Sequence, residues 1–323
     1  FNYGSSMASG WGIPVATDIA FAVGILALFK NRIPASLMVF LLTLATADDL
    51  GAIVVIALFY GKNIQVIFLT GALLTCFVLF VTNRIKTYSV VPYFFFGSLL
   101  WLLLLKSGIN ADIAGVITAF AIPVAGKINS PAFSSKMEKS SMDFTFQNSE
   151  QDQYFQRSED QEDTLKKMQK DILLVYSPLQ RLINSLHGWA LFFIMPIFAL
   201  ANTGIPIDPS GFQSIFSENL VLGIIAGLSL GKPIGIVGAA YIAVLCGLAD
   251  LPSDLRWRHI MVAGLLGGIG FTMSLFIADL SFTSGDLASC NSAKMSILLG
   301  SFLSAILGIT ATLSYLKVPA KNA

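Results

Sequence analysis

The stretch that decides the fold reads Ala45-Thr46-Ala47-Asp48-Asp49-Leu50-Gly51, two adjacent carboxylates within a long apolar run. If residues 35–60 form one helix, it is roughly 39 Å long at about 1.5 Å per residue, enough to cross a hydrocarbon core of about 30 Å with some tilt. Both carboxylates would then lie near the bilayer midplane, where an ionised group is costly. Such residues persist if they face a watery cavity, pair with a cation or hold protons, and each outcome favours transport.

The whole chain is apolar and weakly charged. Only 12% of its 323 residues are charged, whereas soluble proteins average about 25%. We therefore predict an all-α polytopic membrane protein, and the net charge of +1 gives no indication of a nucleic-acid partner. About nine apolar segments are long enough to be transmembrane helices: 11–29, 35–60, 64–82, 89–105, 109–125, 179–201, 219–246, 259–280 and 291–316.

Between the fifth and sixth segments the chain changes character. Residues 127–178 are rich in Ser, Gln, Asp, Glu and Lys, with few apolar residues to bury. We expect a solvated, partly disordered loop, either a mere connection or a regulatory element, in which 160–176 can form a helix on the membrane surface. The loop would separate an N-terminal transmembrane part, 1–126, from a C-terminal one, 179–323.

Lys and Arg are distributed unequally over the two sides that nine spans create. One set of loops holds sixteen of them and the other set three, and the remaining one, Lys232, lies inside an apolar segment. Cytoplasmic loops are enriched in Lys and Arg. We therefore predict that the 127–178 loop and the C-terminus are cytoplasmic and that Phe1 is external.

The carboxylate pair has the chemistry of a cation site. On a helix Asp48 and Asp49 point about 100° apart, so one can line a cavity while the other reaches a neighbouring helix. Oxygen-rich anionic sites suit hard cations such as Na⁺ or Li⁺, and two close carboxylates also split their proton affinities. The simpler alternative is that both residues cap a short helix over 49–60.

A first interrupted helix is predicted at Asp18. Pro14 removes an amide donor, and Thr17 and Asp18 are N-cap residues for a helix that begins near Ile19. In a broken membrane helix, the Asp18 carboxylate would compensate two half-helix ends. Alternatively, residues 1–17 are a loop and Asp18 caps a helix at the surface.

Lys232 and a glycine cluster complete the candidate site. Lys232 is far from both ends of its apolar segment, so it needs a counter-ion, for which Asp48 and Asp49 are candidates; the alternative is snorkelling to an interface. Residues 267–270, Gly-Gly-Ile-Gly, weaken the eighth segment and predict a second interrupted helix. Tight packing through small residues is the alternative for these glycines.

Four stretches together resemble signature regions of the NhaA family of Na⁺/H⁺ antiporters: 11–22, 48–53, 231–235 and 268–274. The resemblance implies an inverted-repeat fold in which two interrupted helices cross near the midplane. It implies electrogenic, pH-regulated export of cytoplasmic Na⁺ or Li⁺ in exchange for external H⁺, across the bacterial inner membrane. Membrane lipid and the transported ions are then the expected partners, and neither enzyme activity nor a cofactor is expected.

The resemblance also implies a role for each matching residue. Asp48 and Asp49 would bind Na⁺ or Li⁺ and carry protons, with Lys232 as counter-ion. Thr17 and Asp18 would compensate the charge at the first break. The remaining matches are Gly268, Gly270, Phe271 and Thr272 at the second break, and His187 for the pH response.

The chain also departs from the family pattern. The family has twelve spans, and this chain is expected to begin just before the fourth, without the usual dimerisation segment of a homodimer. Asp112 and Asp279 are acidic where neutral residues are expected, and we interpret both as interfacial. An inactive fragment of an antiporter is therefore one alternative. A retinal-type pump and an intramembrane aspartyl protease are others, although adjacent aspartates fit the first poorly and Phe271 stands where the second needs Asp.

Overall fold

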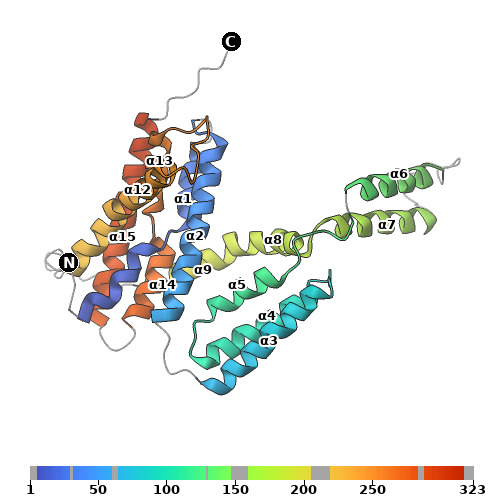
Figure 1. The fold of residues 1–323 in the computed structure, drawn as a ribbon, viewed down its shortest axis with the longest axis horizontal. Coiled ribbons are helices and arrows are strands. Elements are labelled where there is room, and N and C mark those ends of the chain that lie inside the picture. The colour runs from blue at the N-terminus through green and yellow to red at the C-terminus, as the bar shows by residue number, and fades with distance from the viewer. Residues whose placement is uncertain are drawn as a thin grey trace, which may run out of the picture. The chain divides into compact units, whose positions relative to one another are not determined.

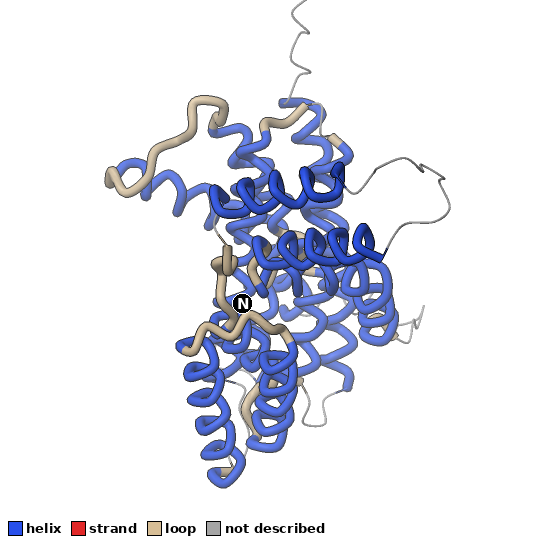
Figure 2. The backbone as a smooth tube through the Cα atoms, turned by 90° about the vertical axis from the view of Figure 1, so that its right-hand side faces the viewer, coloured by secondary structure: helices blue, strands red, loops and turns tan. Residues whose placement is uncertain are grey.

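The computed structural model describes residues 6–29, 32–59, 65–128, 130–146, 159–204, 219–282 and 287–315, and every regular element within these ranges is a helix (Figure 2). The first half of the chain forms the 3-10 helix η1 (Ser6–Val15), α1 (Ile19–Leu28), α2 (Ala35–Phe59), α3 (Val66–Arg84), α4 (Val91–Ser107), α5 (Asp112–Ala121), α6 (Ser130–Phe146) and α7 (Glu159–Val175). The second half forms α8 (Pro178–Trp189), the π-helix η2 (Ala190–Ile194), α9 (Met195–Asn202), α11 (Asn219–Ala226), the π-helix η3 (Gly227–Gly231), α12 (Lys232–Leu245), α13 (Trp257–Gly267), α14 (Phe271–Ser281) and α15 (Leu287–Tyr315).

These helices account for all nine predicted apolar segments. Within the part of the chain that the structure describes, six helical stretches are long and apolar enough to cross a membrane, a seventh is the bent pair α13–α14, and α4 and α5 are shorter apolar helices. An all-helical polytopic membrane architecture is therefore confirmed. The fifth segment is shorter than predicted because α5 ends at Ala121: Ile122 has extended dihedrals (φ −78°, ψ 133°), and Pro123 follows it.

By packing, the chain divides into two compact units, residues 1–60 with 193–323, and residues 61–192. In the second unit α3, α4 and α5 pack together around buried side chains that include Leu79, Tyr93 and Leu100. The predicted division of the chain into two transmembrane parts, 1–126 and 179–323, separated by a cytoplasmic loop, 127–178, stays a prediction.

The expectation of a partly disordered loop is wrong for residues 130–146, which form α6. Phe133, Met137 and Phe144 are partly buried at helical spacing on α6, which packs against α7. These few apolar residues form a stripe that the average composition conceals. The helix foreseen at 160–176 is confirmed as α7, and the stretch 147–158 lies outside the described residues.

In the first unit, two broken helices cross. The halves η1 and α14 pack against each other in one buried cluster that includes Ile13 and Leu275. The other halves, α1 and α13, pack together in a second cluster that includes Leu26 and Leu266. Each broken helix therefore passes from one cluster to the other at its break. Helix α13 lies beside both α12 and α15 (Figure 1).

Candidate functional site

Both interruptions lie where the sequence predicts them. Helix η1 ends at Val15, and α1 begins at Ile19, with Asp18 as the N-cap residue that accepts a hydrogen bond from the Phe21 N–H at 3.2 Å. The second interruption covers residues 268–270, and α13 and α14 meet there at a bend of 46°. Helix η1 keeps 3-10 geometry over ten residues, which is longer than is usual for such helices.

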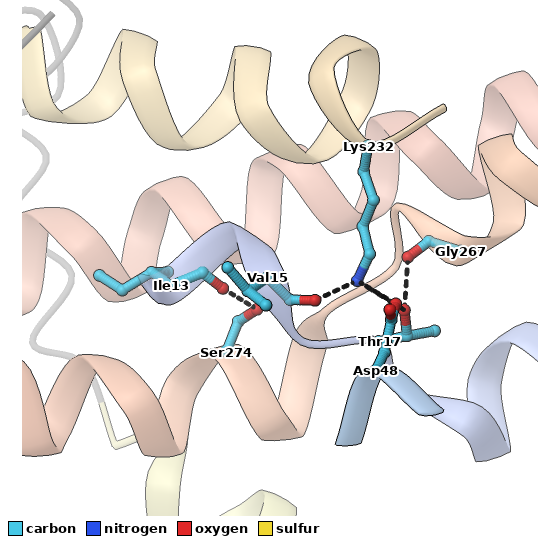
Figure 3. Close-up of polar contacts among 7 residues, drawn as sticks. All are labelled: Ile13, Val15, Thr17, Asp48, Lys232, Gly267 and Ser274. Atoms are coloured by element: carbon cyan, nitrogen blue, oxygen red, sulfur yellow. Dashed lines mark hydrogen bonds and ion pairs between the residues drawn. The ribbon is translucent and has the colours of Figure 1, made fainter. Parts of the chain in front are cut away.

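The two breaks satisfy each other's backbone groups. The Asp18 N–H donates to the Ile269 carbonyl at 2.7 Å, and the Thr17 hydroxyl is 3.0 Å from the Gly267 carbonyl oxygen. In turn, the Ser274 hydroxyl donates to the Ile13 carbonyl at 2.8 Å (Figure 3). Since an unpaired backbone group inside a membrane costs several kcal/mol, these contacts make two open helix ends tolerable at the same place.

Asp18 caps two half-helices at once. Besides the Phe21 N–H of α1, its carboxylate accepts from the Thr272 N–H at 3.1 Å and from the Thr272 hydroxyl at 2.5 Å, both at the start of α14. The Asp18 residue is only 1% exposed. A helix N-terminus carries partial positive charge, so one buried carboxylate faces two such ends. This is the arrangement that charge compensation requires, and it places Thr272 directly at the site.

Lys232 reaches the first break from α12. Its ammonium donates to the Val15 carbonyl at 2.7 Å and to the Thr17 hydroxyl oxygen at 2.5 Å, and lies 3.1 Å from Asp48 Oδ2 (Figure 3). Thr17 Oγ1 is also 2.8 Å from Asp48 Oδ2. The Lys232 side chain is 9% exposed and that of Asp48 is 25% exposed. Snorkelling to an interface is therefore the wrong description of this lysine, because it points at the break.

A π-helical turn precedes the lysine and was not foreseen. The Lys232 N–H donates to the Gly227 carbonyl, five residues back, and η3 ends where α12 begins. Such bulges are frequent at functional sites, because the extra residue shifts the direction of the next side chain. Pro233, which cannot donate a backbone hydrogen bond, is the signal that could have indicated it.

Asp49 is placed differently from its neighbour. Lys232 contacts Asp48, and one carboxylate oxygen of Asp49 is buried without a hydrogen-bond partner among the described residues. A buried carboxylate oxygen without a donor is expensive. The surroundings of Asp49 therefore differ from those of Asp48, whose carboxylate is paired with Lys232.

Close packing holds the second break. A Cβ atom on Gly268 would overlap the Leu228 carbonyl oxygen and lie 2.8 Å from the Ser304 hydroxyl, and one on Gly270 would overlap Ser274. The Phe271 N–H donates to the Ser301 hydroxyl of α15 at 3.1 Å. The supporting serines were missed, although polar residues on one face of the apolar helix α15 were a usable signal.

None of the contacts described above involves the remaining predicted residues. His187 is in the last turn of α8, in the second compact unit, with its side chain exposed, and its part in a pH response stays a prediction. Asp112 lies in the first turn of α5, and Asp279 of α14 forms an ion pair with Lys294 of α15. Within the described residues, no group of three or more His, Cys, Asp or Glu side chains could hold a metal ion by itself.

Comparison with known proteins fits this geometry. The model of the family described as Na⁺/H⁺ antiporter 1 matches residues 1–312. The chain is 44% identical over 300 residues to Na⁺/H⁺ antiporter NhaA 1 of Saccharophagus degradans, a match that covers 93% of this chain and 64% of the relative. It is 45% identical over 299 residues to Na⁺/H⁺ antiporter NhaA of Helicobacter pylori, with 93% and 66% covered. For the NhaA antiporter of Dechloromonas aromatica the identity is 44% over 308 residues, with 95% and 67% covered.

The chain thus spans about two thirds of the length of the curated relatives that it matches. The family match extends over nearly the whole chain and includes both breaks, the aspartate pair and Lys232. The chain belongs to the Na⁺/H⁺ antiporter 1 family.

Proposed function

We propose that the protein exports cytoplasmic Na⁺ or Li⁺ in exchange for external H⁺, and that Asp48 and Asp49 carry both the cation and the protons. The observation that carries this proposal is the position of the Lys232 ammonium. It occupies a set of three oxygens, from Val15, Thr17 and Asp48, at 2.5–3.1 Å.

A monovalent cation could use the same oxygens. Hard cations take carboxylate, hydroxyl and carbonyl oxygens as ligands, and the ammonium marks where one positive charge is stabilised beside the break. Na⁺ or Li⁺ would displace the ammonium from Asp48 and gain the unpaired Asp49 oxygen, which the lysine leaves unused. Lysine and cation therefore compete for Asp48, and a proton competes with the cation for Asp49.

The two breaks are the places where the half-helices can shift during the exchange cycle. The short hydrogen bonds between residues 17–18 and 267–272 can be exchanged for others when the half-helices shift. A bound ion moves that equilibrium only through its different affinity for the two states. Two carboxylates can take up two protons as one monovalent cation leaves, and this supports electrogenic exchange.

The proposal includes the cellular setting. The protein would lie in the bacterial inner membrane, with residues 127–178 and the C-terminus in the cytoplasm, as the distribution of Lys and Arg favours. Regulation by pH through His187 and assembly as a homodimer remain further parts of the prediction.

Reconstituted vesicles test the proposal. Na⁺ or Li⁺, but not K⁺, should dissipate an imposed pH gradient in vesicles that contain the protein, and Asp48→Asn and Asp49→Asn should each abolish the response. Asp112→Asn is the matched control, because it removes an acidic group near the end of another apolar helix and should leave exchange unchanged. Full exchange in both aspartate variants would overturn the proposal, and no exchange by a correctly inserted parent protein would favour the inactive-fragment alternative.

A further inference from the structure

One partly buried ion pair is unused by the proposed exchange. Asp279 of α14 and Lys294 of α15 form an ion pair with Nζ and Oδ1 2.7 Å apart. The lysine side chain is 13% exposed and the aspartate side chain 36% exposed. A lysine so little exposed needs a counter-ion, but the pair adds nothing to the oxygen set around Lys232.

The pair lies on the same seam as a contact at the site. Residues seven apart on a helix lie on one face, so Lys294 shares a face of α15 with Ser301, which accepts the Phe271 N–H at 3.1 Å. Thr272 and Asp279 share a face of α14 in the same way. The α14–α15 seam is thus held by one polar contact at the break and by another about 10.5 Å further along, at about 1.5 Å per residue.

The side chains that α15 buries in this seam differ along its length. Those next to the pair are small, and include Ser289, Ser292, Ala293 and Ser296, whereas Ile297 is large and lies in one buried cluster with Leu275 of α14. Small residues allow close approach of two helices, but they interlock less than large side chains. At the end near the pair, the ion pair therefore helps to set how far α14 slides along α15.

The register matters because α14 begins at the site. Its Thr272 amide and hydroxyl are 3.1 and 2.5 Å from the Asp18 carboxylate. A slide of α14 away from Asp18 by about one residue rise, roughly 1.5 Å, would lengthen both contacts and weaken these hydrogen bonds.

We infer that Asp279 and Lys294 are a positioning pair, which holds α14 in register against α15. In this way the pair keeps the Thr272 amide and hydroxyl within hydrogen-bonding distance of the Asp18 carboxylate. The two charges act by holding α14 in place, and they do not need to contact the transported cation. The transport measurement below rests on the proposed exchange function, whereas the amide-exchange measurement does not.

The native Cys290 offers a covalent replacement for the pair. Its Sγ lies 3.5 Å from Asp279 Oδ1, so Asp279→Cys places two thiols side by side across the seam. Copper phenanthroline with oxygen would remove two electrons and two protons from these thiols and form one disulfide. Cys76→Ala and Cys246→Ala, introduced together, provide a background without the other two cysteines.

Two readouts are measured on the parent, Asp279→Asn and Asp279→Cys proteins. We expect Asp279→Asn and reduced Asp279→Cys to raise the apparent KM for Na⁺ roughly fivefold or more per folded molecule, because misplacement of the site weakens binding. Amide hydrogen exchange of the Thr272 region should become faster in both variants. Oxidation should restore both readouts in Asp279→Cys but not in Asp279→Cys with Cys290→Ala.

The outcomes separate this inference from the proposed function. An active parent with unchanged KM and amide exchange in Asp279→Asn would overturn the inference. A disulfide that forms but leaves KM raised would also overturn it, since the charge and not the register would then be required. A parent without Na⁺/H⁺ exchange would refute the proposed function alone, and amide exchange would still decide whether the pair sets the register.

Discussion

Replacing Asp18 by asparagine should destabilise both broken helices at once. The change keeps the shape of the side chain and removes the negative charge that faces the N-termini of α1 and α14. Each charge–dipole interaction contributes about 1 kcal/mol. The amide also cannot accept every hydrogen bond that the carboxylate accepts, so one buried N–H, of Phe21 or Thr272, loses its acceptor at a cost of about 1–3 kcal/mol. The free energy of unfolding should therefore fall by about 3–5 kcal/mol.

Thermal unfolding in detergent measures this loss. At roughly 2 °C per kcal/mol for a chain of this size, the apparent melting temperature of Asp18→Asn should fall by about 6–10 °C. Asp250→Asn is the control, because Asp250 is an exposed acidic residue after α12 and its substitution should leave the melting temperature within about 1 °C. An Asp18→Asn protein as stable as the control would refute the claim that this carboxylate holds the two breaks together.

Three further changes test other parts of the structure. Gly268→Ala should lower the melting temperature by several degrees and impair exchange, because its Cβ would overlap the Leu228 carbonyl oxygen, whereas Gly235→Ala, with open space around it, should do neither; equal effects would contradict the packing described. Lys232→Met should destabilise the protein by about 3 kcal/mol by leaving a charge unpaired, and the second change Asp48→Asn should recover part of that loss in a double-mutant cycle of melting temperatures; strict additivity would show that the pair is not coupled. Replacing residues 130–173 by a short Gly/Ser linker should leave the rate of Na⁺/H⁺ exchange per inserted molecule unchanged, because backbone hydrogen bonds hold the ends of this segment together; a large change in rate would favour a regulatory role.

Local chemistry explains what the sequence predicted well. Asp18 is suited to the N-cap position because its side chain is short and polar. In the structure, α1 begins at the next residue, Ile19. The glycines at 268 and 270 interrupt a helix for equally local reasons, since they lack the side chain that favours helical conformations. Both breaks could therefore be located without knowledge of the packing.

Long-range packing explains what the sequence left open. Which aspartate meets Lys232 depends on the register of α2 against α12, elements that are far apart in the chain. The same holds for Ser301, whose hydroxyl accepts from an amide thirty residues away. The helix α6 was missed for another reason. Its stripe of a few apolar residues is not visible in the average composition of the segment, which is dominated by polar residues.

Cation-induced proton release tests the central claim most directly. Purified protein in a weakly buffered solution is titrated with NaCl, with KCl as the control salt, while a pH indicator reports protons that leave the protein. If Asp48 and Asp49 hold either protons or a cation, Na⁺ should release protons from the parent protein, and both Asp48→Asn and Asp49→Asn should release fewer or none. Equal proton release by the parent and by both variants would contradict the account.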